Sequence, residues 1–141
     1  LDKYLSLLND EVDGLLLTSR YIRYYGAEFD IAEGVAIVTK AGCRYFTDSR
    51  YIESAASGIE GFEVLEVNRE NPYAKRLNDA IAEFGVHTLG YEEDYLTVQE
   101  FMSYEKKLNA KLVPYNEKIY GFRAVKEFIR LQNKRKGGKV T

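Results

Sequence analysis

Carboxylate side chains are the residues of this chain whose types and spacing come nearest to a catalytic pattern. Asp48 and Glu53 follow one strand-like run, and Glu92, Glu93 and Asp94 follow another. Carboxylates that gather at the ends of neighbouring strands bind magnesium in two-metal nucleases. Simpler interpretations are a helix cap at Asp48 and a solvated acidic loop after the second run, and we favour these.

The single histidine and the single cysteine lie outside any recognisable catalytic pattern. His87 begins a short strand-like run and has no metal-ligand spacing around it, and no Gly-x-Ser-x-Gly elbow accompanies it. Cys43 follows a turn glycine, with no histidine or second cysteine nearby to activate its thiol. We therefore expect structural roles for both residues.

Aromatic and cationic side chains are concentrated in one stretch, where Tyr21, Tyr24 and Tyr25 alternate with Arg20 and Arg23. Tyrosine and arginine are enriched at protein interfaces. The same composition suits a helix laid on a sheet with its tyrosine hydroxyls in solvent. Composition alone leaves both interpretations open.

Length, charge and cysteine content restrict the class of protein. A chain of 141 residues with 45% hydrophobic residues can bury one core, and its net charge of −2 provides no field to attract nucleic acid or an anionic membrane. One cysteine excludes an internal disulfide and suits a reducing compartment. The sequence contains neither a membrane-length apolar run nor a signal-peptide pattern. We expect a cytoplasmic globular domain.

The first half of the chain predicts helices, a buried strand and a hairpin. Apolar residues at helical spacing over 1–12 predict an opening helix, and 19–26 predicts a short capped one. The apolar run at 15–18 predicts a central strand buried on both faces. Runs at 35–38 and 44–47 flank a glycine-bearing turn and predict an antiparallel hairpin.

The middle of the chain predicts two helices around an edge strand. Asp48 or Ser49 should cap the first helix, and the alternating pattern at 62–67 is typical of a strand near the sheet edge. Asn71 as the cap and Pro72 in the first turn predict the start of the second helix, and Gly85 predicts its end.

The last part predicts two further strands around a capped helix. Thr97-Val98-Gln99-Glu100 is a capping box, and the helix that it opens should turn Val98, Phe101, Met102 and Leu108 inward. Strands are expected at 86–91 and 111–114, a helix from 117 to 130, and a disordered tail at 133–141. Six strands interleaved with helices predict a three-layer-like α/β sandwich around one mixed sheet.

Several short motifs occur in a defined order. They are Ile22-Arg23-Tyr24, the strand and turn from Gly34 to Gly42, Tyr45-Phe46-Thr47-Asp48-Ser49-Arg50-Tyr51-Ile52-Glu53, Leu89-Gly90-Tyr91-Glu92-Glu93-Asp94-Tyr95-Leu96-Thr97 and Arg123-Ala124-Val125-Lys126. Together they closely resemble the N-terminal domain of the creatinase/prolidase/aminopeptidase P family. The resemblance covers residues 1–126 and implies a ribonuclease-H-like sheet.

This resemblance implies a division of labour between two domains. A C-terminal pita-bread domain would hold two divalent metal ions (Mn, Co or Zn) and hydrolyse peptide bonds that precede proline. Arg123-Ala124-Val125-Lys126 resembles the join, so 127–141 would begin the interdomain segment or form a disordered tail. None of the metal ligands falls in this chain, which we therefore expect to be inactive alone, with no catalytic, cofactor or metal residues.

The resemblance also implies where this domain acts. In related enzymes the N-terminal domain contributes to dimer or tetramer contacts and restricts access of peptides to the active site. The residues that match this region are Arg23, Tyr24, Tyr25 and Phe29. The implied partners are the catalytic domain of the same polypeptide, further subunits and proline-containing peptides, without nucleic acid or membrane. The alternative is a protein-binding module of a non-catalytic relative.

Overall fold

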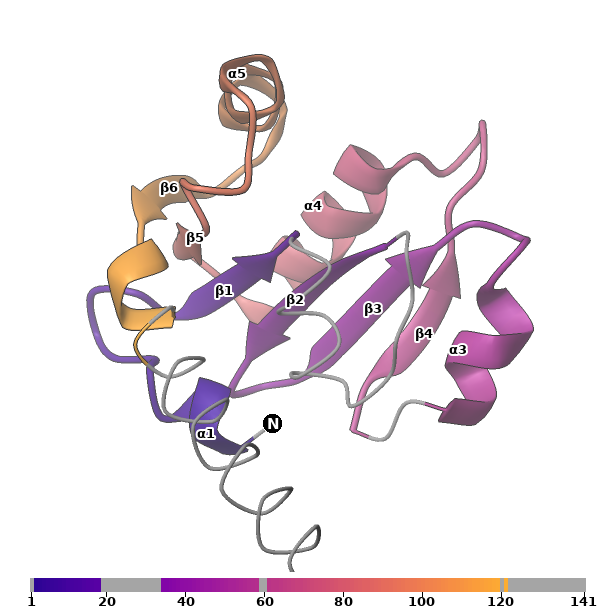
Figure 1. Ribbon diagram of the computed structural model, residues 1–141, viewed down its shortest axis with the longest axis horizontal. Helices are drawn as coiled ribbons and strands as arrows, with labels where there is room; N and C mark the ends of the chain where they lie inside the picture. Colours follow the sequence, from indigo (N-terminus) through magenta and orange to yellow (C-terminus); the bar gives the residue numbers. More distant parts are fainter. Residues whose placement is uncertain (1, 19–33, 59–60, 120, 122–141) are drawn as a thin grey trace, which may run out of the picture.

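The computed structural model describes residues 2–18, 34–58, 61–119 and 121. Six strands form one sheet in the order β4-β3-β2-β1-β5-β6 (Figure 1). They are β1 (Gly14–Leu17), β2 (Val35–Thr39), β3 (Cys43–Thr47), β4 (Glu63–Glu66), β5 (Thr88–Tyr91) and β6 (Lys111–Pro114). The mixed, six-stranded α/β sheet that the sequence predicts is therefore confirmed.

Strand directions explain how the chain builds this order. β2 is antiparallel to both β1 and β3, whereas the β3–β4, β1–β5 and β5–β6 pairs are parallel. The hairpin prediction is confirmed, because β2 and β3 pair directly. β1 lies in the centre of the sheet and β4 at an edge, as predicted.

Helices cover both faces of the sheet. They are α1 (Asp2–Leu5), α3 (Ile52–Gly58), α4 (Tyr73–Phe84) and α5 (Val98–Lys107). α1 and α3 contribute to the core on one face, and α4 contributes to the core on the other (Figure 1). α5 lies near the β5–β6 end of the sheet, and its Phe101 and Tyr104 pack on the same core as α4 (Figure 1).

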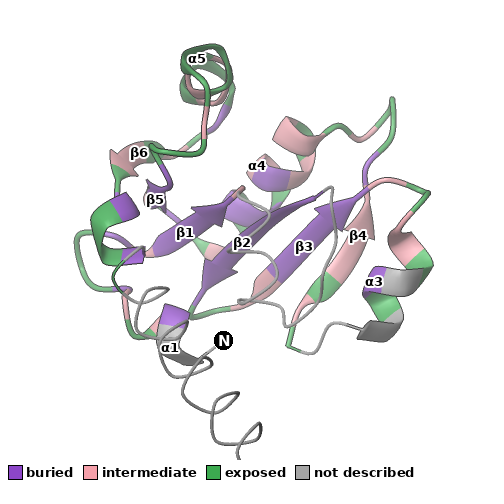
Figure 2. Ribbon diagram, viewed as in Figure 1, coloured by how far each residue is buried: buried purple, intermediate pink, exposed green. Residues whose placement is uncertain are grey.

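Successive side chains of the central strands pack on opposite faces of the sheet. Leu15 and Leu17 join the core on the α1 face, while Leu16 joins the core on the α4 face. Every residue of β1 and β2 is buried (Figure 2). Because both faces are covered, a continuous apolar run is the sequence pattern that such strands require.

The opening helix is shorter than predicted. α1 ends at Leu5, although Leu8 and Val12 are buried in the core on the same face. The Asn9 side chain accepts hydrogen bonds from the backbone N–H groups of Glu11 and Val12, at 2.8 and 2.9 Å. This local turn competes with the helix for the same backbone donors.

The ends of α4 agree only partly with the sequence pattern. Gly85 ends the helix in the left-handed conformation (φ 67°), as predicted. At the other end Pro72, and not Asn71, occupies the N-cap position, without a side-chain cap. Asn71 instead donates its backbone N–H to the Asn68 side chain, so the predicted cap is wrong by one residue.

α5 has its predicted start, but half of its predicted inward residues are wrong. Thr97 and Glu100 form the reciprocal capping box. Leu108 is buried and Phe101 is half-buried, whereas Val98 and Met102 are exposed. The physical reason is that Phe101, Tyr104 and Leu108, at helical spacing, form the face of α5 that packs on the core, and Val98 and Met102 lie off that face.

Three predicted segments lie largely or wholly outside the described residues. These are the helix at 19–26, the tail at 133–141 and most of the helix at 117–130. Residues 116–119 are helical, and Ile119 is buried in the core on the α1 face.

A buried arginine links β3, β4 and α4. Arg44 donates to the carboxylates of Glu63 and Glu83, and its guanidinium carbon lies 4.6 Å from the centre of the Phe84 ring. Its side chain is only 8% exposed, whereas both carboxylates are more than half exposed. The arginine is thus the buried member of this cluster.

We predict that Arg44→Ala lowers the free energy of unfolding by about 1–3 kcal/mol, because partly buried charge-assisted hydrogen bonds and a cation–π contact are lost. Arg50→Ala is the matched control, since Arg50 is 67% exposed and pairs with Asp48 on the surface. The control should lose less than about 1 kcal/mol. Urea unfolding measures both variants, and equal losses would contradict the assignment.

Candidate functional site

The predicted interface residues belong to a segment that joins two central strands. Arg23, Tyr24, Tyr25 and Phe29 lie outside the described residues. Their segment, 19–33, connects the end of β1 to the start of β2. The described residues on either side therefore determine where this segment leaves and re-enters the sheet.

A buried carboxylate fixes the point where the segment leaves β1. Glu92 is 0% exposed, and its Oε1 accepts a hydrogen bond from the backbone N–H of Thr18 at 2.7 Å. β1 and β5 pair in parallel with Leu16 opposite Tyr91, which places Glu92 beside the end of β1. A hydrogen bond from a backbone N–H to a carboxylate is among the stronger ones in proteins.

A glycine fixes the point where the segment re-enters β2. Gly34 has a φ of 152°, and a Cβ atom built on it would lie 2.3 Å from the Tyr45 hydroxyl oxygen. Tyr45 is 1% exposed and cannot move aside without opening the core. Glycine is therefore required at this position by both backbone conformation and space.

The rest of the acidic run binds the start of the helical residues 116–119. The Glu93 carboxylate accepts from the backbone N–H of Asn116 at 2.9 Å, and Asp94 accepts from its side-chain amide at 2.9 Å. Asn116 is buried. The prediction of a merely solvated acidic loop is thus wrong, because Glu92 is buried and its two neighbours bind the chain beyond β6.

The place of Glu92 in the sequence carries one signal of its burial. Glu92 follows directly after the strand expected at 86–91, where a carboxylate can accept a hydrogen bond from the backbone at the end of a neighbouring strand. Parallel pairing between β1 and β5 determines which backbone N–H it reaches. That pairing joins residues far apart in the sequence, so the local sequence pattern could not predict it.

The carboxylates of the nuclease interpretation are not brought together. Asp48 follows β3 and Glu92 follows β5, and both β2 and β1 lie between these strands. Asp48 is paired with Arg50, and this hydrogen bond lowers the pKa of the Asp48 carboxyl from its ordinary value. In the part of the chain that the structure describes, no three His, Cys, Asp or Glu side chains are placed to share a metal ion.

Asp48 also differs from its predicted role as a helix cap. Its Oδ1 accepts from the Arg50 backbone N–H at 2.9 Å, within the turn that precedes α3. The helix itself begins at Ile52. Asp48 therefore stabilises the turn between β3 and α3, which is one step removed from the helix end.

The two remaining candidates for chemistry, Cys43 and His87, lie in environments that favour structural roles. The Cys43 thiol donates to the Thr39 carbonyl oxygen at 3.7 Å, and burial raises the pKa of this thiol, which disfavours a thiolate nucleophile. His87 is exposed, and its backbone N–H donates to the Asp13 carboxylate at 3.0 Å.

A groove of about 580 Å³ separates the first turn of α4 from α5. Its lining consists of Pro72, Tyr73, Ala74, Gln99, Glu100, Ser103, Tyr104 and Lys107. Glu100 is already engaged in the capping box. The lining contains neither a nucleophile–base pair nor a group of metal ligands, so the groove has the character of a binding surface.

We predict that Glu92→Ala destabilises the domain by about 1–3 kcal/mol, because the N–H of Thr18 loses a buried acceptor. Glu70→Ala, in an exposed turn, is the control and should change stability by less than about 0.5 kcal/mol. Amide hydrogen exchange should also accelerate at Thr18 in the first variant. An unchanged exchange rate there would show that the bond does not hold the end of β1.

The comparisons with known proteins agree with the fold. The profile of the creatinase/prolidase N-terminal domain matches residues 4–125. YqhT, an uncharacterized peptidase of Bacillus subtilis strain 168, is 30% identical over 116 residues, which are 82% of this chain and 32% of that protein. The chain therefore spans about a third of the length of this relative.

Solved structures give the same result. An Xaa-Pro dipeptidase from Bacillus anthracis is 28% identical with a TM-score of 0.70, over 74% of this chain and 29% of that one. The N-terminal domain of the cytoplasmic peptidase PepQ from Mycobacterium tuberculosis is 22% identical with a TM-score of 0.67, over 84% of this chain and 92% of that domain.

The profile match extends over most of the chain and includes all six strands of the described sheet. The chain belongs to the creatinase/prolidase N-terminal domain family.

Proposed function

We propose that this chain is the non-catalytic N-terminal domain of a metallopeptidase that hydrolyses the peptide bond preceding proline. The observation that carries the proposal is the family match over residues 4–125, combined with the small share of its peptidase relatives that the chain spans. The reaction is assigned to a C-terminal domain that would follow residues 1–126, with 127–141 as the start of the connection.

The metal chemistry is assigned to that second domain. Two divalent ions, Mn, Co or Zn, would there lower the pKa of a bound water and supply a hydroxide nucleophile. Three carboxylates of the candidate set are engaged in other ways, with Glu92 and Glu93 accepting backbone hydrogen bonds and Asp48 paired with Arg50. These engagements support a scaffold role.

We assign oligomer contacts and substrate gating to the segment that contains Arg23, Tyr24, Tyr25 and Phe29. Its support is the combination of aromatic and arginine side chains with two rigid anchors, Glu92 at one end and Gly34 at the other. A segment anchored on a central strand can present such side chains to a neighbouring subunit at little conformational cost.

The proposed location is the cytoplasm. A cytoplasmic peptidase supplies one of the similar domains, and the single cysteine fits a reducing compartment. Among the described residues, none of the helices combines the length and the apolar character that crossing a membrane demands.

The proposal predicts that the 141-residue chain does not cleave Xaa-Pro dipeptides in the presence of Mn²⁺, whereas a longer protein that includes the following domain does. Release of free proline measures both. Hydrolysis by the short chain at enzymatic rates would overturn the assignment. A longer protein that lacks two aspartates, one histidine and two glutamates as ligands, and that is inactive, would instead support a protein-binding module.

A second prediction concerns gating. In the longer protein, Arg23→Ala combined with Tyr24→Ala should change the oligomeric state or raise the kcat/KM for long peptides relative to dipeptides. Arg50→Ala, which removes an exposed ion pair elsewhere, is the control. Light scattering and a peptide-length series provide the readouts. Unchanged assembly and unchanged length preference would remove this segment from the proposal while leaving the peptidase assignment in place.

A further inference from the structure

A row of polar side chains runs along one wall of the groove between α4 and α5. Gln99, Ser103 and Lys107 all line the groove, and they are spaced four residues apart on α5. Side chains at this spacing are neighbours on one surface of a helix. At a rise of about 1.5 Å per residue, the row is about 12 Å long. We call Gln99, Ser103 and Lys107 the α5 polar row.

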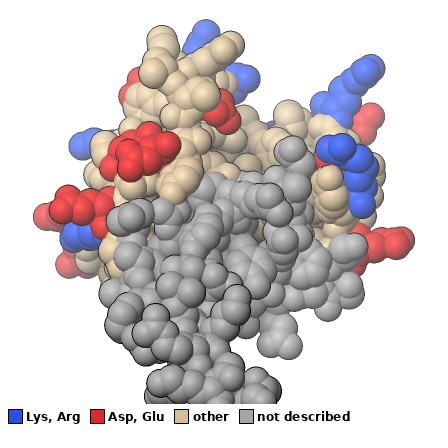
Figure 3. Space-filling model, in the orientation of Figure 1, with Lys and Arg blue, Asp and Glu red and all other residues tan. Residues whose placement is uncertain are grey.

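The rest of the groove is mostly apolar. Pro72, Tyr73, Ala74 and Tyr104 contribute to its lining. Figure 3 shows the surface formed by α5, at the top of the view, as largely uncharged with charged side chains at its margins. Sites for small ligands combine an apolar lining with a few polar groups, and the groove volume of about 580 Å³ is typical of them.

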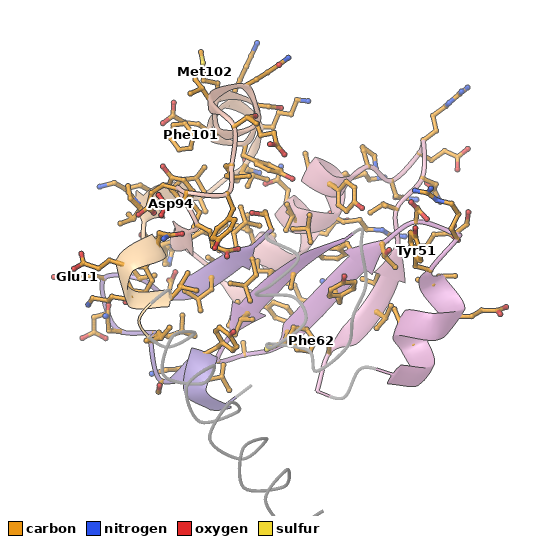
Figure 4. All side chains as sticks on the ribbon, viewed as in Figure 1. Glu11, Tyr51, Phe62, Asp94, Phe101 and Met102 are labelled. Atoms are coloured by element: carbon orange, nitrogen blue, oxygen red, sulfur yellow. The ribbon has the colours of Figure 1, made fainter. Side chains whose placement is uncertain are left out.

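The two helices that form the groove are held together. The Asn78 side chain of α4 donates to the Lys107 carbonyl oxygen at 2.9 Å and accepts from the Asn109 backbone N–H at 2.8 Å. Phe101 stacks on Tyr91 with ring centres 5.1 Å apart, on the side of α5 nearer the sheet (Figure 4). A ligand therefore enters a groove whose walls are already ordered, which lowers the cost of binding.

Lys107 provides the charge in the groove that is available to a ligand. The other charged residue of the lining, Glu100, accepts the Thr97 backbone N–H at 3.1 Å within the capping box. The three side chains of the α5 polar row make no hydrogen bond or ion pair with another described residue. The row thus offers an amide, a hydroxyl and, at one end, an ammonium group.

We propose that this groove binds the free C-terminal end of a short extended peptide, with the peptide carboxylate on the Lys107 ammonium. Gln99 and Ser103 then pair with peptide N–H and C=O groups, because an amide and a hydroxyl can both donate and accept hydrogen bonds. The apolar lining takes the peptide side chains. The charge complementarity of Lys107 and a carboxylate fixes the direction of the peptide.

The length of the row favours a peptide over a simple organic acid. An extended chain rises about 3.3 Å per residue, so the row of about 12 Å matches three or four residues. An organic acid without peptide groups would leave Gln99 and Ser103 without partners. The inference does not depend on the peptidase assignment, since it concerns only binding in this groove.

NMR titration of the 141-residue chain with acetyl-Phe-Ala-Leu tests the proposal. The backbone amide signals of Ala74 and Ser103 should shift, and the free acid should bind at least about tenfold more tightly than the C-terminal amide, because the amide lacks the charge that pairs with Lys107. An equal Kd for the two peptides, or shifts that avoid the groove, would overturn the proposal.

Two lysines in the last turn of α5 provide a matched pair of variants. Lys107→Gln should raise the Kd of the free acid to that of the amide. Lys106→Gln removes the same charge from an exposed neighbour that does not line the groove, and it should leave the Kd unchanged. Equal effects of the two variants would show attraction by net charge alone and would contradict the assignment.

A bulky side chain tests the place of binding. Ser103→Trp fills the groove and should abolish binding of both peptides, whereas Met102→Trp lies on the exposed side of α5 outside the lining and should bind as the wild type does. Circular dichroism verifies that both variants fold. Undiminished binding by Ser103→Trp would overturn the site. Binding of 3-phenylpropionate as tight as that of the free-acid peptide would overturn the choice of a peptide.

Discussion

The hydrogen bond between the buried Glu92 carboxylate and the backbone of Thr18 is the constraint on which the arrangement depends. It joins the end of β1 to the turn that follows β5. β1 lies inside the sheet, where it pairs antiparallel with β2 and parallel with β5. Burial of a carboxylate without partners costs several kcal/mol, so its bonds must be satisfied in the folded state. The bond therefore fixes the position of the Thr18 backbone at the end of β1.

From that point the other features follow. Glu93 and Asp94 bind Asn116, so the same short acidic run also holds the start of the helical residues 116–119 beyond β6. Gly34 precedes β2 and has no side chain, which lets the backbone pass close to the Tyr45 ring. The carboxylates that follow β5 thus bind the Thr18 backbone and Asn116, and residues 19–33 connect two fixed points of the sheet, Thr18 and Gly34.

Local sequence pattern predicted the strands well because both faces of β1 and β2 are covered, which demands uninterrupted apolar runs. It failed where a tertiary partner decided the outcome. On α5 the side chains that pack on the core are Phe101 and Tyr104, and not Val98 and Met102. The opening helix differs for a local reason, because the Asn9 side chain forms a turn with the backbone of Glu11 and Val12. The burial of Glu92 depended on a parallel pairing between residues more than 70 positions apart. The order of the motifs along the chain identified the domain family, which the match over residues 4–125 confirms. No single residue identified a functional site.

We propose that this domain belongs to a metallopeptidase whose metal ions are bound by a different domain. Metal analysis of purified proteins after incubation with Mn²⁺ and gel filtration tests it most directly. The account predicts two bound ions per chain in the longer protein with the following domain, and no stoichiometric metal in the 141-residue chain. Stoichiometric, tightly bound metal in the 141-residue chain would contradict it.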